Sequence, residues 1–308
     1  MKTPFAFPLT FIVMFASLLT INGCSLMSSQ TSAPTEFSQQ ANTSEPKKTL
    51  RLATITPVIK SMTEALVADT PMEVVYLPSN RYSIKRLPGW LKKQDYNSFP
   101  SVDAIIGISS LRPDLDAYPA FRLHNISVVP IDLAHALIPG GERVAITHSS
   151  QGSQSSAYFW LNPSNALIML GILHRDLNAL VENKIQQEEL RASTLKMLAQ
   201  NRADITQALR TIQIELDKKL METGVMQVTT DKPELQELLA ATLLPDVTLQ
   251  EAKSGDFPTL LITSRKRSHK SFRELPQHIS VWSVDDFGKV RKNSFQQRWL
   301  GNLRISPL

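Results

Sequence analysis

The sequence contains only one cysteine, Cys24, in 308 residues. A single thiol cannot form an intrachain disulfide and cannot supply the several thiolates of a cysteine-rich zinc site. Catalytic motifs are missing too: there is no Gly-x-Ser-x-Gly elbow, no phosphate-binding loop and no His-Glu-x-x-His pattern. Serine, histidine and aspartate occur, but their spacing does not indicate a catalytic triad. We therefore predict that the protein is not an enzyme.

Histidine is scarce and scattered. The six histidines show no pair at i, i+4 or at another metal-ligand spacing. They are His124, His135, His148, His174, His269 and His278. We expect each of them to have a surface or supporting role.

The formal net charge of +5 is a modest excess for a chain of this length. Basic residues cluster at 265–270 and 289–298, where the pattern is typical of a solvated loop and the polar face of a helix. Neither cluster has the interleaved aromatic residues or the fold signature of a nucleic-acid-binding protein. We predict no nucleic-acid partner.

The N-terminus has the pattern of a secretion signal. Lys2 is followed by an apolar run over residues 5–19, which is too short to cross a membrane comfortably. The stretch "LLTINGCS" resembles the bacterial lipobox, in which a small residue precedes a cysteine that becomes lipid-modified. This pattern predicts a signal peptide over residues 1–23 and a lipid anchor on Cys24, which leaves no free thiol in the mature chain. Residues 24–48 are rich in Ser, Thr, Gln and Pro and predict a flexible tether.

The rest of the chain predicts an α/β fold with two lobes. With 42% hydrophobic residues the chain can bury one large core or two smaller ones. Short runs rich in β-branched residues alternate with helical or irregular segments, a pattern typical of mainly parallel sheets. We predict strands at 49–57, 72–78, 102–108, 126–132, 225–230, 259–264 and 279–284.

Two helices in the middle of the chain divide these strands into groups. Asn162 and Pro163 are suited to the cap and first position of a helix whose apolar residues recur as far as Val181. A longer helix is predicted over 186–222, because neither Gly nor Pro occurs between Gly171 and Gly224. A run of about 35 residues extends roughly 50 Å, which suits a rigid connection between lobes. The predicted lobes are 49–185 and 223–308.

Two motifs resemble those of a known family. Trp160-Leu161-Asn162-Pro163 matches the second half of the Asp-Pro-His-x-Trp-Leu-x-Pro helix entry of the zinc and manganese solute-binding lipoproteins of bacterial ABC importers. "VDDFG" at 284–288 is similar to the same family's Leu-Asp-Pro-Leu-Gly turn. The resemblance spans about residues 50–305. It implies a monomeric, lipid-anchored protein that faces the periplasm or the cell exterior, carries zinc or manganese in a cleft between its lobes and delivers it to an ABC permease.

The resemblance also implies where four metal ligands would lie. The first would follow the second strand, where "LPSNRYSIKRLP" contains no histidine, and the second falls on Tyr158. The third falls on Asp231, for which an equally supported interpretation is a helix N-cap before Pro233. Only Asp285 keeps a family-like ligand. Three of the four positions have changed, which puts metal binding itself in question.

A basic segment near the first ligand position offers a different ligand class. If Arg81, Lys85 and Arg86 face the cleft, they would repel a dication and favour an anion. The alternative is that these three basic residues lie on the solvent face of a short helix.

The leading prediction for the function is a solute-binding lipoprotein with an altered metal site. The alternative is an envelope lipoprotein that reuses the two-lobed scaffold for adhesion or partner docking, or that binds a non-metal, anionic ligand.

Overall fold

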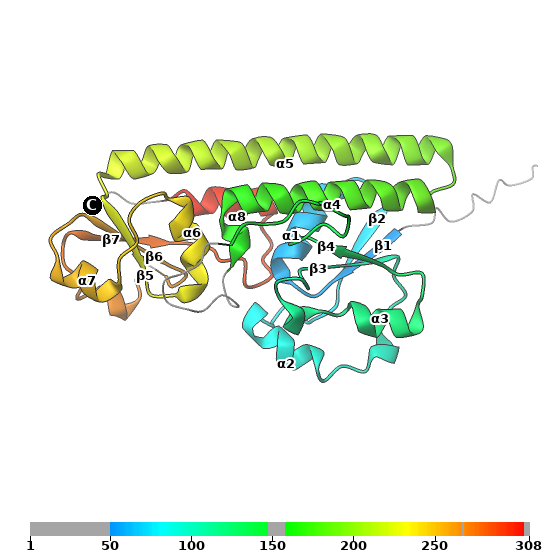
Figure 1. The fold of residues 1–308 in the computed structure, drawn as a ribbon, viewed down its shortest axis with the longest axis horizontal. Coiled ribbons are helices and arrows are strands. Elements are labelled where there is room, and N and C mark those ends of the chain that lie inside the picture. The colour runs from blue at the N-terminus through cyan, green and yellow to red at the C-terminus, as the bar shows by residue number, and fades with distance from the viewer. Residues whose placement is uncertain (1–49, 147–157, 267, 305–308) are drawn as a thin grey trace, which may run out of the picture. The chain divides into compact units, whose positions relative to one another are not determined.

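The computed structural model of the protein contains two parallel sheets and a long helix (Figure 1). It describes residues 50–146, 158–266 and 268–304. The predicted signal peptide, the lipid-modified Cys24 and the tether lie outside the described residues. Among the described residues, no helix combines the length and the apolar composition that a membrane crossing requires.

The first sheet has the strand order β2-β1-β3-β4, and its three strand pairs are all parallel. Its strands are β1 Leu50–Thr54, β2 Met72–Tyr76, β3 Ala104–Gly107 and β4 Val129–Asp132. The second sheet has the order β5-β6-β7, again parallel, with β5 Gln227–Thr230, β6 Thr259–Thr263 and β7 Ile279–Ser283. The prediction of an α/β fold with mainly parallel sheets is therefore confirmed, and each of the seven strands lies within a predicted run. We call the region around the first sheet the N-terminal lobe and the region around the second sheet the C-terminal lobe.

Helices lie between the strands of each lobe or follow them. The N-terminal lobe contains α1 Pro57–Leu66, α2 Leu87–Leu91, α3 Tyr118–His124 and α4 Pro163–Lys184. The C-terminal lobe contains α6 Gln236–Ala241, α7 Leu249–Ser254 and α8 Phe295–Asn302. Asn162 caps α4 as predicted, since its side chain accepts a hydrogen bond of 3.0 Å from the Ser164 N–H, and Pro163 takes the first helical position.

The predicted long helix is α5, which runs from Glu188 to Thr223 over 36 residues. Gly224 follows it in the left-handed conformation, with φ of 63°, which a residue with a side chain rarely adopts. Figure 1 shows α5 lying alongside α4, and α5 also packs against α1 and α8. The connecting helix is thus supported by several other helices along its length.

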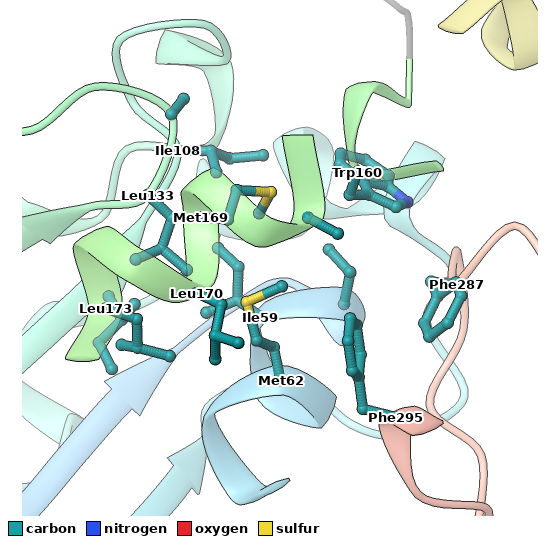
Figure 2. Packing of buried hydrophobic residues seen from close by; sticks show 14 of the residues in the cluster. Ile59, Met62, Ile108, Leu133, Trp160, Met169, Leu170, Leu173, Phe287 and Phe295 are labelled. Carbon is teal, nitrogen blue, oxygen red and sulfur yellow. The ribbon is translucent and has the colours of Figure 1, made fainter. Parts of the chain in front are cut away.

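The two lobes share one apolar core. Leu52 in β1 and Leu260 in β6 are both completely buried, and they belong to one continuous cluster of buried residues. Figure 2 shows side chains of α1, such as Ile59 and Met62, beside Leu170 of α4 within this cluster. The buried core is therefore continuous across the two lobes.

Candidate functional site

A polar cavity of about 340 Å³ lies where the two lobes meet. The N-terminal lobe contributes residues 83–85 and Tyr158, and the C-terminal lobe contributes loops that follow β5, β6 and β7. The carboxyl ends of parallel strands are where α/β proteins place ligand sites. This cavity is therefore the candidate site.

Hydrogen bonds join the lobes around the cavity. The Ile84 N–H donates to the Gly288 carbonyl at 2.8 Å, and the Tyr158 N–H donates to the Glu234 carbonyl at 2.8 Å. The indole N–H of Trp160 donates to the Asp286 carbonyl at 3.0 Å. These bonds fix the cavity walls through the backbone.

Tyr158 lines the cavity at the position where the family resemblance implies a histidine. Its ring stacks on Trp160, with centroids 4.8 Å apart and an interplanar angle of 18°. Burial raises the pKa of the Tyr158 phenol well above its ordinary value, and the nearby negative charges of Asp286 and Glu234 raise it further. The hydroxyl is therefore neutral at physiological pH and is a poor ligand for zinc or manganese.

Asp285 also lines the cavity, but its carboxylate already has a cation. Arg298 donates from Nε to Oδ2 and from Nη2 to Oδ1, both at 2.8 Å, and Arg291 Nε lies 3.2 Å from Oδ2. The Phe287 N–H donates to Oδ1 at 3.0 Å. Burial alone would raise the pKa of Asp285, but the Arg298 hydrogen bonds and charge outweigh it and hold the pKa below its ordinary value.

Arg298 is an internal residue. Its side chain is only 2% exposed, and its guanidinium lies 4.1 Å from the centre of the Phe287 ring. The prediction that the basic run 289–298 is solvated is therefore wrong at Arg298, although Lys289, Arg291 and Lys292 are exposed. Arg298 is buried because α8 packs this face against the loop that carries Asp285.

Asp231 does not line the cavity. Its side chain is 11% exposed, and its Oδ2 lies 3.2 Å from Arg265 Nε. The alternative prediction that Asp231 caps the helical turn Pro233–Leu235 is wrong, because Lys232 takes that position and its N–H is satisfied by Thr230 Oγ1 at 3.0 Å.

Glu234 is an acidic cavity residue that the sequence analysis missed. It is only 8% exposed, and its Oε1 forms an ion pair with Lys85 of the N-terminal lobe. Burial alone would raise the pKa of Glu234, but the hydrogen bond and charge of Lys85 lower it below its ordinary value. The sequence signal that could have identified Glu234 was an acidic residue directly after Pro233, shortly after a predicted strand.

Among the basic residues proposed as an anion site, only Lys85 lines the cavity. The Arg81 guanidinium lies 5.5 Å from the centre of the Tyr82 ring, and both Arg81 and Arg86 are exposed outside the cavity lining. The cavity instead contains three further basic residues, Lys232, Lys289 and Arg291.

The histidines are not assembled into a site in the part of the chain that the structure describes. His174 is buried in α4 near Arg202, and burial together with that positive charge lowers its pKa. His148 lies outside the described residues. Across residues 50–146, 158–266 and 268–304, no group of three or more His, Cys, Asp or Glu side chains is arranged to hold a metal ion.

The fold is similar to those of solved metal-binding proteins. A Mn-bound periplasmic metal-binding protein (S38A mutant) from Candidatus Liberibacter asiaticus matches with a TM-score of 0.59 and 14% identity, over 83% of this chain and 97% of that one. FpvC from Pseudomonas aeruginosa, solved with Mn²⁺, matches with a TM-score of 0.57 and 13% identity, over 84% of this chain and 97% of FpvC. The Zn(II)-bound ZnuA-like domain of AdcA from Streptococcus pneumoniae matches with a TM-score of 0.55 and 11% identity, over 83% of this chain and 97% of that domain.

No protein-family model and no curated protein matches the sequence. At these low identities the structural matches establish a shared two-lobed fold. The resemblance drawn from the Trp-Leu-Asn-Pro motif is confirmed at that level.

Proposed function

We propose that this protein is a solute-binding lipoprotein of the bacterial envelope, anchored through Cys24, whose cleft binds an anionic solute and not zinc or manganese. The fold shared with FpvC and AdcA supports a binding role rather than catalysis. An ABC permease would then be the membrane partner, as the family resemblance implies.

The observation that carries this proposal is the pairing of Asp285 with Arg298. Asp285 is the one carboxylate retained at a family ligand position, and both its oxygens accept hydrogen bonds from a guanidinium that is 2% exposed. A metal ion would have to displace that guanidinium and leave it buried without a counterion, which is strongly unfavourable. The neutral Tyr158 phenol provides no compensating ligand.

The basic residues around the cavity support an anionic solute. Lys85, Lys232, Lys289 and Arg291 line it together with only three carboxylates, and the buried Arg298 adds a positive charge behind Asp285. A site with a positive balance attracts anions and repels dications.

Metal analysis tests the exclusion of zinc and manganese. We expect the purified, chelator-treated protein to take up no stoichiometric zinc or manganese on titration calorimetry, and Asp285→Asn to behave like the wild type. Asp256→Asn, at an exposed position outside the cavity, is the matched control. One tightly bound ion per chain, lost in Asp285→Asn and kept in the control, would overturn the proposal.

The anchor is tested separately in cells. We expect Cys24→Ser to move the protein from the membrane fraction to the soluble fraction and to abolish incorporation of a labelled fatty acid. Unchanged membrane association and labelling would exclude Cys24 as the lipidated residue.

A second function, a scaffold for adhesion or partner docking, is favoured by the hydrogen bonds that join the two lobes directly. Backbone hydrogen bonds from Ile84 and Tyr158 and the shared core hold the cleft in one arrangement. X-ray scattering and calorimetry with candidate anions distinguish the two functions: a scaffold binds none of them and keeps its dimensions, whereas a solute-binding protein shows saturable binding.

A further inference from the structure

The cavity contains unpaired groups of both signs. Within the described residues, the ammonium groups of Lys232 and Lys289 have no ion pair, and Asp286 has none either. Asp286 Oδ1 accepts the Gly288 N–H at 2.8 Å. Pairing among the described residues therefore leaves positive and negative groups available in the cavity lining.

Glu234 adds a buried acceptor without a partner. Lys85 occupies Oε1, but Oε2 is buried and receives no hydrogen bond from the described residues. The residue lines the cavity and is 8% exposed, so a solute would reach Oε2 only after a rotation of the Glu234 side chain. An unsatisfied buried carboxylate oxygen is unfavourable, and a ligand that donates a hydrogen bond would relieve that penalty.

Resting on the proposed solute-binding function and adding an ammonium group to its anionic solute, we propose that the cleft recognises a small amphoteric solute of the α-amino acid class, whose carboxylate is the anionic part. Its carboxylate would lie against Lys232 and Lys289, and its ammonium group would donate to Glu234 Oε2 and Asp286. The Lys85–Glu234 and Arg298–Asp285 pairs would stay intact.

The unpaired charges in the cavity favour a ligand that carries both a carboxylate and an ammonium group. An anion without a donor would satisfy the lysines but leave Glu234 Oε2 unmatched, and its charge would face Asp286. A simple amine would satisfy the carboxylates but face Lys232 and Lys289. A ligand with both a carboxylate and an ammonium group can pair with the lysines and with the carboxylates at once. A pocket that places its polar groups in this way discriminates strongly against ligands that lack one of the two groups.

The probes are matched in shape. Each of the standard L-amino acids is titrated into the purified protein by calorimetry, alongside the desamino acid and the decarboxylated amine of any that binds. We expect at least one amino acid to bind, and its desamino acid and amine to bind at least tenfold more weakly.

The variants remove one end of the site at a time. Glu234→Gln keeps the side-chain shape and removes the charge, and the double variant Lys232→Ala/Lys289→Ala removes the other end. We expect each to weaken amino acid binding at least tenfold. Glu274→Gln and Lys253→Ala, both at exposed positions outside the cavity, serve as matched controls and should bind like the wild type.

Because Glu234→Gln also loses the pair with Lys85, its fold is verified by circular dichroism, and Asp286→Asn provides a second acidic variant. Equal binding of the amino acid and its desamino acid, unaffected by Glu234→Gln and Asp286→Asn, would overturn the amphoteric ligand while leaving an anionic solute. If no amino acid binds but an anion binds saturably, the amphoteric ligand is likewise overturned and an anionic solute remains. No binding of any probe would overturn the solute-binding function as well.

Discussion

Asp285 and Glu234 line the same cavity, but their environments differ. Asp285 is paired within the C-terminal lobe by Arg298, a cation that is 2% exposed. Glu234 is paired across the lobes by Lys85, whose side chain is 60% exposed. Asp285 has hydrogen bonds on both oxygens, whereas Glu234 has one buried oxygen without a partner in the part of the chain that the structure describes.

The comparison separates a structural carboxylate from an available one. A bidentate guanidinium in a buried setting is a permanent counterion and closes its site to other cations. A flexible, exposed ammonium on one oxygen leaves the other free for a ligand. Acidic character at a family ligand position therefore does not by itself indicate a ligand site.

The largest effect is expected from Arg298→Met. It leaves Asp285 buried with only Arg291 nearby, and we expect a loss of about 3 kcal/mol in the free energy of unfolding, measured by urea denaturation. Arg291→Met, at a side chain that is 58% exposed, should change stability by less than about 1 kcal/mol. Equal losses in the two variants would show that Arg298 is not the dominant partner.

Removing both members of the buried pair should restore much of that loss. In Asp285→Asn/Arg298→Met no charge is left buried and unpaired, so we expect stability within about 1–2 kcal/mol of the wild type. A double-mutant cycle with the two single variants measures the coupling. Simple additivity of the single losses would contradict the assignment of a coupled pair.

The cross-lobe pair should show a smaller and asymmetric effect. Lys85→Met leaves the buried Glu234 carboxylate unpaired, and we expect a loss of about 1–2 kcal/mol. Glu234→Gln leaves only an exposed ammonium, which water solvates, so its loss should stay below about 1 kcal/mol. Urea denaturation of both variants checks the order, and a larger loss in Glu234→Gln would reverse the interpretation.

Much of the fold was predictable because its signals are local. Runs of β-branched residues predicted the strands, and Asn162-Pro163 predicted the start of α4. The absence of Gly and Pro before Gly224 predicted α5. Short helices such as α3 and α7 were missed, because six or seven residues carry too little periodicity.

The site was less predictable because it depends on side chains brought together by tertiary structure. Asp285 and Tyr158, which the motifs predicted to lie in a cleft, both line the cavity. The ion pairs at the cavity were not predicted. Lys85 and Glu234 are 149 residues apart, and Arg298 belongs to a basic run whose pattern predicts exposure to solvent. Burial decides which charges pair, and composition alone does not reveal it.

The smallest expected effect is on the pH dependence of stability, and it tests both carboxylates together. The pKa of Asp285 and that of Glu234 are lowered by folding from ordinary values of 3.8 and 4.5. Below these values the unfolded chain binds protons before the folded chain does, so the stabilisation is complete above about pH 5 and is lost as the pH falls.

We therefore expect the free energy of unfolding to fall below pH 5, with a slope set by the number of protons that the unfolded chain takes up before the folded chain. Asp285→Asn should flatten the slope most, because its carboxylate is held by the bidentate Arg298 pair, and Glu234→Gln should flatten it less. Urea denaturation at a series of pH values gives these slopes, with Asp256→Asn as the control expected to match the wild type. A wild-type slope in Asp285→Asn would mean that Arg298 does not stabilise the charged carboxylate, and the contrast between the two carboxylates would then fail.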